Sequence, residues 1–135
     1  MHWRCRSFDF DLTDRVLIMG VLNVTPDSFS DGGKFAESAV AIEHAQGMIA
    51  EGADLIDLGG ESTRPGSAPV AAAEQWRRIE AVLGALVALG ACVSVDTSSA
   101  RVAGLALARG AHAVNDVTAL GDPAMAGVVA HASAG

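Results

Sequence analysis

The sequence is poor in several residue types, and each shortage argues against a class of protein. It has no tyrosine, two cysteines in 135 residues, and nine lysine and arginine residues against sixteen aspartate and glutamate residues. The formal net charge of −7 argues against nucleic acid or a membrane surface as the partner, because both favour a positive face. An anionic ligand would therefore need a local device, such as a loop arginine or a bound cation.

The two cysteines, Cys5 and Cys92, lie far apart in the sequence. A disulfide framework would need a denser set of cysteines, and a metal site would need closer spacing. We therefore expect two reduced thiols in a cytoplasmic protein. The four histidines also lack metal-ligand spacing, and we expect them at the surface or in helices. No segment reaches the roughly 18 apolar residues that span a bilayer, and the N-terminus lacks the apolar core of a signal peptide.

Half of the residues are hydrophobic, and the length suits one domain. Four short apolar runs predict strands over residues 16–22, 54–59, 92–96 and 113–117. None of them alternates strictly between apolar and polar residues, so we expect both faces of the sheet to be covered, as in parallel sheets. Upstream, residues 8–12 do alternate, which predicts one short, half-buried strand.

Segments with helical spacing lie between the predicted strands. Apolar residues recur every three or four positions in one of them, at Trp76, Ile79, Leu83 and Leu86. Gln75 belongs to the predicted polar face of this helix. Ser98 or Ser99 can cap the next helix, and Asp122 with Pro123 forms a helix-start pair.

A Gly-Ala pair precedes a predicted strand three times, at residues 52–53, 90–91 and 110–111. Glycine directly after a helix can adopt the left-handed conformation that ends it, and a short turn then leads into the strand. The predicted order therefore alternates strands and helices through four units, which indicates a parallel sheet with right-handed crossovers.

Polar residues occur at the end of each predicted strand. They are Asn23, Asp57, Asp96 and Asn115. One such residue could serve only as a helix cap, but four in succession indicate more. In a (β/α) array all carboxyl ends of the strands lie at one end, and ligand sites are built there.

The loops after the first two strands offer groups for an anionic ligand, although each has a plainer interpretation. Asn23 could face solvent in a turn, or its amide oxygen could bind a hard cation such as Mg²⁺. In the segment "GGESTRPGS" (59–67), Thr63 offers a hydroxyl and Arg64 can grip phosphate oxygens with two hydrogen bonds. The alternative is an ordinary turn at Pro65 and Gly66 that only redirects the chain.

Asp96 and Asn115 form the most informative pair. A carboxylate at the end of the apolar run "CVSVD" is costly unless it is paired, and it can accept two hydrogen bonds from a flat ring rich in N–H groups. Asn115 can donate and accept beside it. The alternative is a structural polar network among the strand ends.

Four segments together resemble dihydropteroate synthase, in the order and at the spacing of that family. They are "MGVLNVTPDSFSDGG", "GADLIDLGGESTRPG", "VSVDT" and "GAHAVNDV", and they cover about residues 16 to 120. Methyltetrahydrofolate methyltransferases, which are related pterin-binding barrels, share the aspartate and asparagine strand ends but lack this combination of loops.

The resemblance implies a role for each of these side chains. Asn23 looks like the residue that binds Mg²⁺ and diphosphate, and Asp96 and Asn115 look like ligands of the pterin ring. Thr63 and Arg64 look like parts of a second mobile loop around the diphosphate and p-aminobenzoate.

The resemblance also assigns the loop after the first strand as a lid. Phe29, Asp31 and Pro65 look like the residues that close over p-aminobenzoate. Asp31 would approach the cation that develops when diphosphate departs, so Asp31 and Arg64 are the expected catalytic residues.

The implied activity joins 6-hydroxymethyl-7,8-dihydropterin diphosphate to p-aminobenzoate, releasing 7,8-dihydropteroate and diphosphate in folate biosynthesis. The implied fold is the (β/α)₈ TIM barrel, an α/β fold of about 250 residues, of which about four units are expected here as a half-barrel. We predict an N-terminal segment over 1–15 with a short strand, and a truncated pterin-binding barrel domain over 16–135.

Full-length members of the family suggest a homodimer and a sulfonamide target. The 135 residues alone are expected to be inactive, because no residue matches the family's later lysine in a "Ser-Arg-Lys" stretch or the late Arg-x-His that grips diphosphate. Two alternatives stay open: a non-catalytic pterin-binding half-barrel or interaction module, and a methyltransferase-like pterin barrel.

Overall fold

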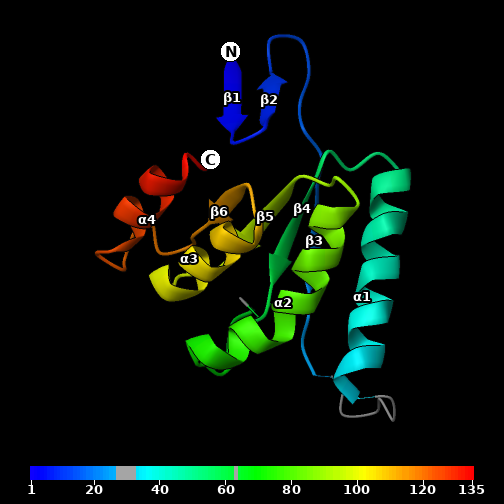
Figure 1. The fold of residues 1–135 in the computed structure, drawn as a ribbon, viewed down its shortest axis with the longest axis vertical. Helices are drawn as coiled ribbons and strands as arrows, with labels where there is room; N and C mark the ends of the chain where they lie inside the picture. The colour runs from blue at the N-terminus through cyan, green and yellow to red at the C-terminus, as the bar shows by residue number, and fades with distance from the viewer. Residues whose placement is uncertain (27–32, 63) are drawn as a thin grey trace.

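The computed structural model describes residues 1–26, 33–62 and 64–135, without the side chains of residues 34 and 35. Its elements are shown in Figure 1. In chain order they are β1 (His2–Cys5), β2 (Phe8–Asp11), β3 (Met19–Asn23), α1 (Gly33–Ala50), β4 (Leu55–Gly59), α2 (Ala72–Ala88), β5 (Val93–Asp96), α3 (Ala100–Arg109), β6 (Ala113–Asn115) and α4 (Met125–Ala132).

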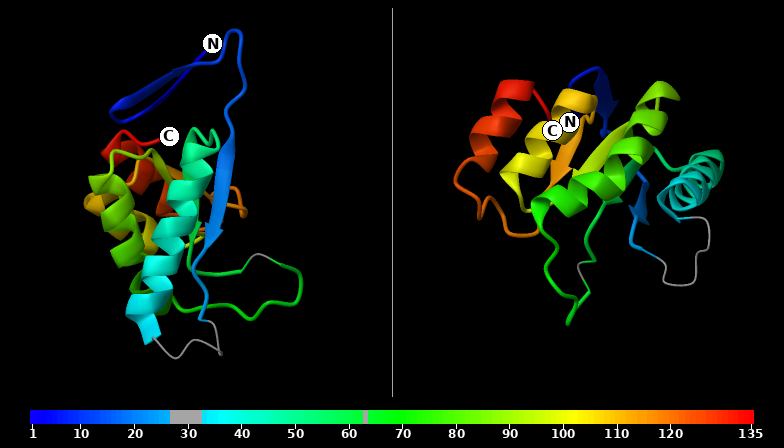
Figure 2. Two further views of the ribbon diagram at one scale, coloured as in Figure 1. Left: turned by 90° about the vertical axis from the view of Figure 1, so that its right-hand side faces the viewer. Right: turned by 60° about the horizontal axis from the view of Figure 1, so that its bottom comes forward.

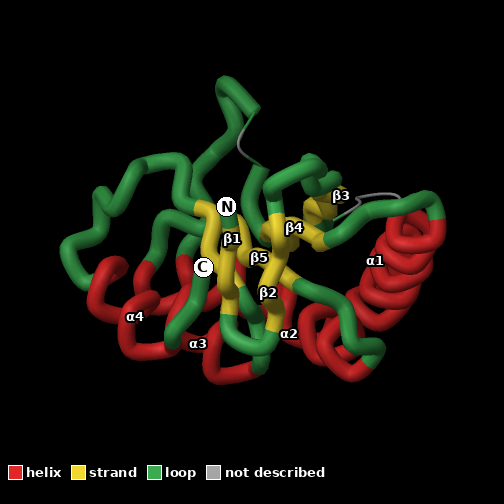
Figure 3. The backbone as a smooth tube through the Cα atoms, turned by 90° about the horizontal axis from the view of Figure 1, so that it is seen from above, coloured by secondary structure: helices red, strands yellow, loops and turns green. Residues whose placement is uncertain are grey.

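The main sheet has four parallel strands in the order β3-β4-β5-β6, and each is followed by a helix. This confirms the predicted alternation of strands and helices and the four βα units. In Figure 3 the helices α1 to α4 form an arc on one side of the strands. The layout is that of one sector of a barrel, with the helices outside and the inner face opposite them.

The expectation that both faces of the sheet are covered is met only in part. Within the described residues no helix lies on the inner face, and Val21 of β3 is 55% exposed there. The inner face is covered at the start of the strands, where the N-terminal hairpin lies (Figure 1).

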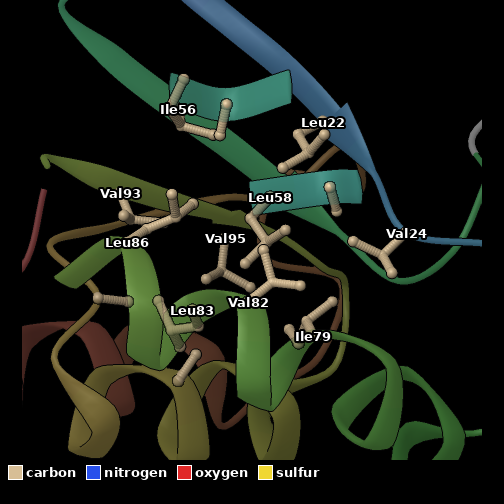
Figure 4. Close-up of a cluster of buried hydrophobic side chains, with 14 of the residues drawn as sticks. Leu22, Val24, Ile56, Leu58, Ile79, Val82, Leu83, Leu86, Val93 and Val95 are labelled. Carbon is tan, nitrogen blue, oxygen red and sulfur yellow. The ribbon is translucent and has the colours of Figure 1, made fainter. Parts of the chain in front are cut away.

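The helix-facing side of the sheet holds the main core. Figure 4 shows the apolar stripe of α2 against side chains of β4 and β5. The stripe is Ile79, Val82, Leu83 and Leu86, and its partners are Ile56, Leu58, Val93 and Val95, all nearly or fully inaccessible to solvent. Each such side chain stabilises the fold by about 1.5–3 kcal/mol. The apolar spacing therefore predicted the buried face of α2 correctly. The prediction for Gln75 is wrong, because this residue is 4% exposed and does not lie on the polar face.

The turns and caps follow the sequence signals closely. Gly52, Gly90 and Gly110 all have positive φ values, of 112°, 79° and 113°, so the three Gly-Ala pairs do mark helix ends. Ser99 caps α3, accepting a hydrogen bond from the Val102 amide at 3.4 Å. Asp122 accepts from the Ala124 amide at 3.0 Å, so it forms the turn before α4, which begins at Met125.

Several boundaries differ from the prediction. The strand predicted over residues 16–22 is β3, which begins at Met19. The strand predicted over residues 113–117 is β6, which already ends at Asn115. Instead of one N-terminal strand there are two, β1 and β2, paired antiparallel. The alternation of residues 8–11 is real, but β1 shows no such pattern and owes its conformation to pairing with β2. The division between residues 15 and 16 stays a prediction.

The hairpin covers the amino-terminal end of the strands with a separate apolar cluster. Its buried members are Cys5, Leu55, Cys92 and Ala113, with Trp3, Phe8, Phe10 and Leu17 packed around them. Cys5 and Cys92 are free thiols with their Sγ atoms 4.0 Å apart, although they are 87 residues apart in sequence. Burial raises the pKa of the Cys92 thiol to about 12 and also raises the pKa of Cys5.

His112 lies at the same end, where the prediction of surface or helical histidines is wrong. It is 8% exposed and precedes β6, and its ring meets Phe8 edge-on at 4.7 Å. Its Nδ1 accepts a hydrogen bond from the Val93 amide at 3.2 Å. Burial, together with the nearby Arg6, lowers the pKa of this imidazole. In the described part of the chain, none of the helices has the length and apolar character required for a membrane crossing.

Candidate ligand-binding site

Strand register brings three of the predicted site residues, Asn23, Asp96 and Asn115, into one row at the carboxyl end of the sheet. Asn23 pairs with Gly59, Gly59 with Asp96, and Asp96 with Asn115. Since side chains alternate along a strand, paired residues share a face. This face is the inner one, because Leu58 and Val95, the neighbours of Gly59 and Asp96, point into the helix-facing core (Figure 4).

Gly59 provides the space into which two of these side chains lean. A Cβ atom at this position would lie 2.9 Å from Asn23 Oδ1 and 3.5 Å from Asp96 Cβ. The absence of a side chain at Gly59 therefore allows the amide and the carboxylate to approach from the two neighbouring strands.

The carboxyl group of Asp96 has a raised pKa. Burial, then the nearby charges of Asp57, Glu61 and Asp116, raises its pKa to about 6. Its carboxylate borders a cleft of about 200 Å³, lined by Glu61, Ser62, Asp96, Thr97, Ser98 and Val117. An acceptor held in acidic surroundings is stabilised by a donor-rich or cationic ligand.

Asp57 lies deeper than the sequence suggests. It is the middle residue of β4 and not its end, and it is 2% exposed. Its Oδ2 accepts a hydrogen bond from Asn115 Nδ2 at 2.9 Å. The sequence pattern predicts Asp57 as a polar strand end but indicates no role for it. Its position two residues before Gly59, and so on the same face of the strand, was the available signal.

A second polar network ties the loop between β4 and α2 to the body of the protein. Glu61 accepts hydrogen bonds from the Val70 amide at 3.0 Å and from Gln75 Nε2 at 2.9 Å. Gln75 Oε1 accepts from Thr97 Oγ1, also at 2.9 Å, just beyond the end of β5. Both ends of the loop are thus fixed, while its middle reaches out past the strand ends (Figure 2). Gln75 is the residue of this network that sequence reasoning misplaced.

The exposed part of that loop contains a tight turn. The Ser67 amide donates to the Arg64 carbonyl at 3.1 Å, and Gly66 has a φ of 85°. Pro65 followed by a positive-φ glycine is typical of a type II turn. The plainer interpretation of this segment as a turn is therefore correct for the backbone. It leaves Arg64 and Pro65 exposed in this loop.

Three predicted site residues, Phe29, Asp31 and Thr63, lie outside the described residues. Among the residues that are described, no group of three histidine, cysteine, aspartate or glutamate side chains could hold a metal ion. Asn23 is exposed and offers one amide oxygen. One protein oxygen is compatible with Mg²⁺, which usually keeps several waters and binds substrate phosphates.

A row of polar side chains at the carboxyl ends of consecutive parallel βα units defines a barrel-type α/β protein with a ligand site at that end. Residues 19–135 match the family model described as pterin binding enzyme. The chain belongs to this family.

Individual proteins agree with this assignment. Dihydropteroate synthase from Bacillus subtilis is 49% identical over 119 residues, which is 87% of this chain and 42% of that protein. The Clostridium difficile dihydropteroate synthase, solved in the presence of pteroic acid, matches with a TM-score of 0.87 at 49% identity, over 93% of this chain and 48% of that one. The Xanthomonas albilineans enzyme with 4-aminobenzoic acid gives a TM-score of 0.86 at 44% identity, over 96% and 48%. The chain thus spans less than half the length of these proteins.

Proposed function

We propose that this chain is part of a dihydropteroate synthase, a transferase that joins 6-hydroxymethyl-7,8-dihydropterin diphosphate to p-aminobenzoate. The observation that carries the proposal is the row Asn23, Gly59, Asp96 and Asn115, in strand register on one face. The row offers a carboxylate and an amide to a flat heterocycle, with a second amide oxygen beside them. The relatives named above, solved with pteroic acid and with 4-aminobenzoic acid, support this choice of ligands.

In the proposed reaction, the amine nitrogen of p-aminobenzoate attacks the methylene carbon of the pterin substrate. The bond from that carbon to the diphosphate oxygen breaks, diphosphate leaves, and the amine loses a proton. Asp96 and Asn115 hold the pterin ring, so that the methylene carbon lies over the carboxyl ends of the strands. Asn23 would hold Mg²⁺, whose charge, when it is bound, stabilises the oxygens of the leaving group.

The two loops carry the remaining proposed roles. Arg64 and Thr63 contact the diphosphate from the loop after β4, and Phe29 and Pro65 close over p-aminobenzoate. Asp31 approaches the cation that develops as diphosphate leaves. The hydrogen bonds of Glu61 with Val70 and Gln75 support this arrangement. They fix the base of the loop, and the exposed part that carries Arg64 can then extend over a ligand.

We also propose a cytoplasmic homodimer at full length, which acts on small molecules and not on nucleic acid, and which sulfonamides inhibit. The free thiols support the cytoplasm as the compartment. The net charge of −7 supports small molecules and not nucleic acid as the ligands.

The test is an assay of diphosphate release by the full-length protein. Release should require the pterin diphosphate, p-aminobenzoate and Mg²⁺ together, and the Asp96→Ala variant should lose most of the activity. Pterin binding without release would favour the non-catalytic module. Transfer of a methyl group from methyltetrahydrofolate, with no diphosphate release, would favour the methyltransferase reading.

A further inference from the structure

Asp57 lies one level below the row of site residues. In strand register it is paired with Val21 on one side and Ser94 on the other, two residues before the pairs that Gly59 makes. Its neighbours Ile56 and Leu58 belong to the helix-facing core (Figure 4). Because side chains alternate along a strand, the Asp57 side chain faces the inner side. It is therefore a nearly inaccessible carboxylate beneath the proposed pterin site.

The hydrogen bond of Asp57 reaches across a strand. Asn115 lies on β6, two strands away and one level higher, and its Nδ2 donates to Asp57 Oδ2 at 2.9 Å. The intervening strand presents Ser94, and β6 presents Ala113 below Asn115. Both side chains are small, and this leaves room for the amide to reach down to the carboxylate.

This bond fixes which end of the Asn115 amide faces the ligand. An ionised carboxylate only accepts hydrogen bonds, whereas an amide has an accepting oxygen and a donating nitrogen. The nitrogen of Asn115 must therefore face Asp57, and Oδ1 points the other way as an acceptor. An asparagine without such a partner can present either end.

The second oxygen of Asp57 supports a functional role. Asp57 Oδ1 is buried and has no hydrogen-bond partner among the described residues. A buried acceptor left unpaired is destabilising by roughly 1–3 kcal/mol. A small apolar side chain would avoid this cost, so stability alone does not account for a carboxylate at this position.

Asp57 also contributes negative charge near the site. It lies close enough to Asp96 for its charge to be one cause, after burial, of the raised pKa of that carboxyl. Asp96 and the oriented oxygen of Asn115 line the site with acceptors, and the charge of Asp57 lies beneath them.

We propose that Asp57 is a positioning residue for ring recognition, which holds the amide of Asn115 so that Oδ1 accepts a hydrogen bond from a ring N–H of the ligand. This inference rests on the proposed function, because it assumes a pterin as the ligand. It extends that function by explaining how the site selects a heterocycle whose edge carries donors.

The test is a residue swap in the full-length protein, with 6-hydroxymethylpterin as the probe and calorimetry as the readout. D57N lets the two amides pair in either orientation, so Asn115 Oδ1 is no longer held toward the ligand, and binding should weaken about tenfold. N115D places two carboxylates together and should weaken it at least as much. In the double variant D57N/N115D, the new amide at position 57 can donate to the new carboxylate at position 115, whose other oxygen faces the ligand. Its affinity should return to within about threefold of the wild-type value.

Ser94→Ala is the matched control, because Ser94 pairs with Asp57 at the same depth and is also buried. We expect it to change pterin affinity less than twofold. The KM for p-aminobenzoate should stay within about twofold in every variant, since the ring of the first substrate alone is affected. If D57N alone does not fold, N115D and the double variant still decide the question.

Losses that multiply in the double variant would overturn the inference, since Asp57 and Asn115 would then act independently. Recovery of thermal stability without recovery of pterin affinity would also overturn it, because it would assign a purely structural role. If either of these two outcomes is found and the wild-type protein still binds pterin, the inference about Asp57 is overturned but the proposed function stands. A wild-type protein that binds no pterin overturns both.

Discussion

The two ends of the same four strands differ in almost every physical property. At the amino-terminal end, the hairpin packs Cys5, Leu55 and Cys92 into an apolar cluster. At the carboxyl end, the strands present Asn23, Asp96 and Asn115, with a carboxylate whose pKa is raised. In barrels of this kind, the first end provides stability and the second provides chemistry. The comparison predicts that substitutions at the two ends affect different measurements.

The largest effect should come from the amino-terminal end. Leu55→Ala removes a buried side chain beneath the hairpin and should lower the free energy of unfolding by about 2–4 kcal/mol, while pterin affinity stays within about twofold. Urea denaturation of the full-length protein measures the first, and calorimetry measures the second. Leu105→Ala on α3, where the side chain is 39% exposed, is the control and should cost less than about 1 kcal/mol. A large loss of pterin affinity in folded Leu55→Ala would break the division between the ends.

The reverse result is expected at the carboxyl end. Asp96→Asn replaces a double acceptor with a group that presents a donor to the ring, so pterin affinity should fall about tenfold to a hundredfold, or roughly 1.5–3 kcal/mol. The affinity for p-aminobenzoate should change much less. Calorimetry with each ligand separates the two effects, and unchanged pterin affinity would remove Asp96 from the site.

A smaller effect should appear in the pH dependence of stability. The pKa of Asp96 is about 6 when folded, against about 3.8 otherwise, so the folded state binds more protons between these values. Stability from this group should therefore fall as the pH rises from about 4 to 6. Because Asp96 is only half-buried, water screens the effect, and we expect a decrease of about 1 kcal/mol.

Denaturation of the wild type and of Asp96→Asn across this range isolates the contribution, because the variant cannot titrate at this position. A wild-type decrease that persists unchanged in Asp96→Asn would assign it to another group.

The smallest expected effect concerns the two buried thiols, Cys5 and Cys92, which should not react with a thiol reagent in the folded protein. Burial raises the pKa of Cys92 to about 12 and that of Cys5 above its usual value, so neither thiol should be ionised near neutral pH. In the folded protein, a thiol reagent such as DTNB should label neither residue within minutes, and in urea it should label both. Rapid labelling of the native protein would mean that the hairpin opens readily, and the contrast between the ends would weaken.

The sequence alone determined the order of strands and helices, because local signals encode it. Apolar runs, the stripe of α2 and the glycines at positions 52, 90 and 110 each depend on neighbours within a few residues. The row of polar strand ends was also predictable, since parallel strands in a (β/α) array all end on the same side. The four predicted strand-end residues, Asn23, Asp57, Asp96 and Asn115, do lie at or just beneath this end.

Only the tertiary structure decided the contacts between residues far apart in the chain. The bond from Asn115 to Asp57 spans 58 residues, the thiols of Cys5 and Cys92 meet across 87, and Gln75 is buried because Glu61 and Thr97 provide its partners. No local pattern encodes such pairs, because strand register and the packing of the hairpin bring them together. A polar residue is predicted at the surface unless its buried partners are known, and those partners come from the fold.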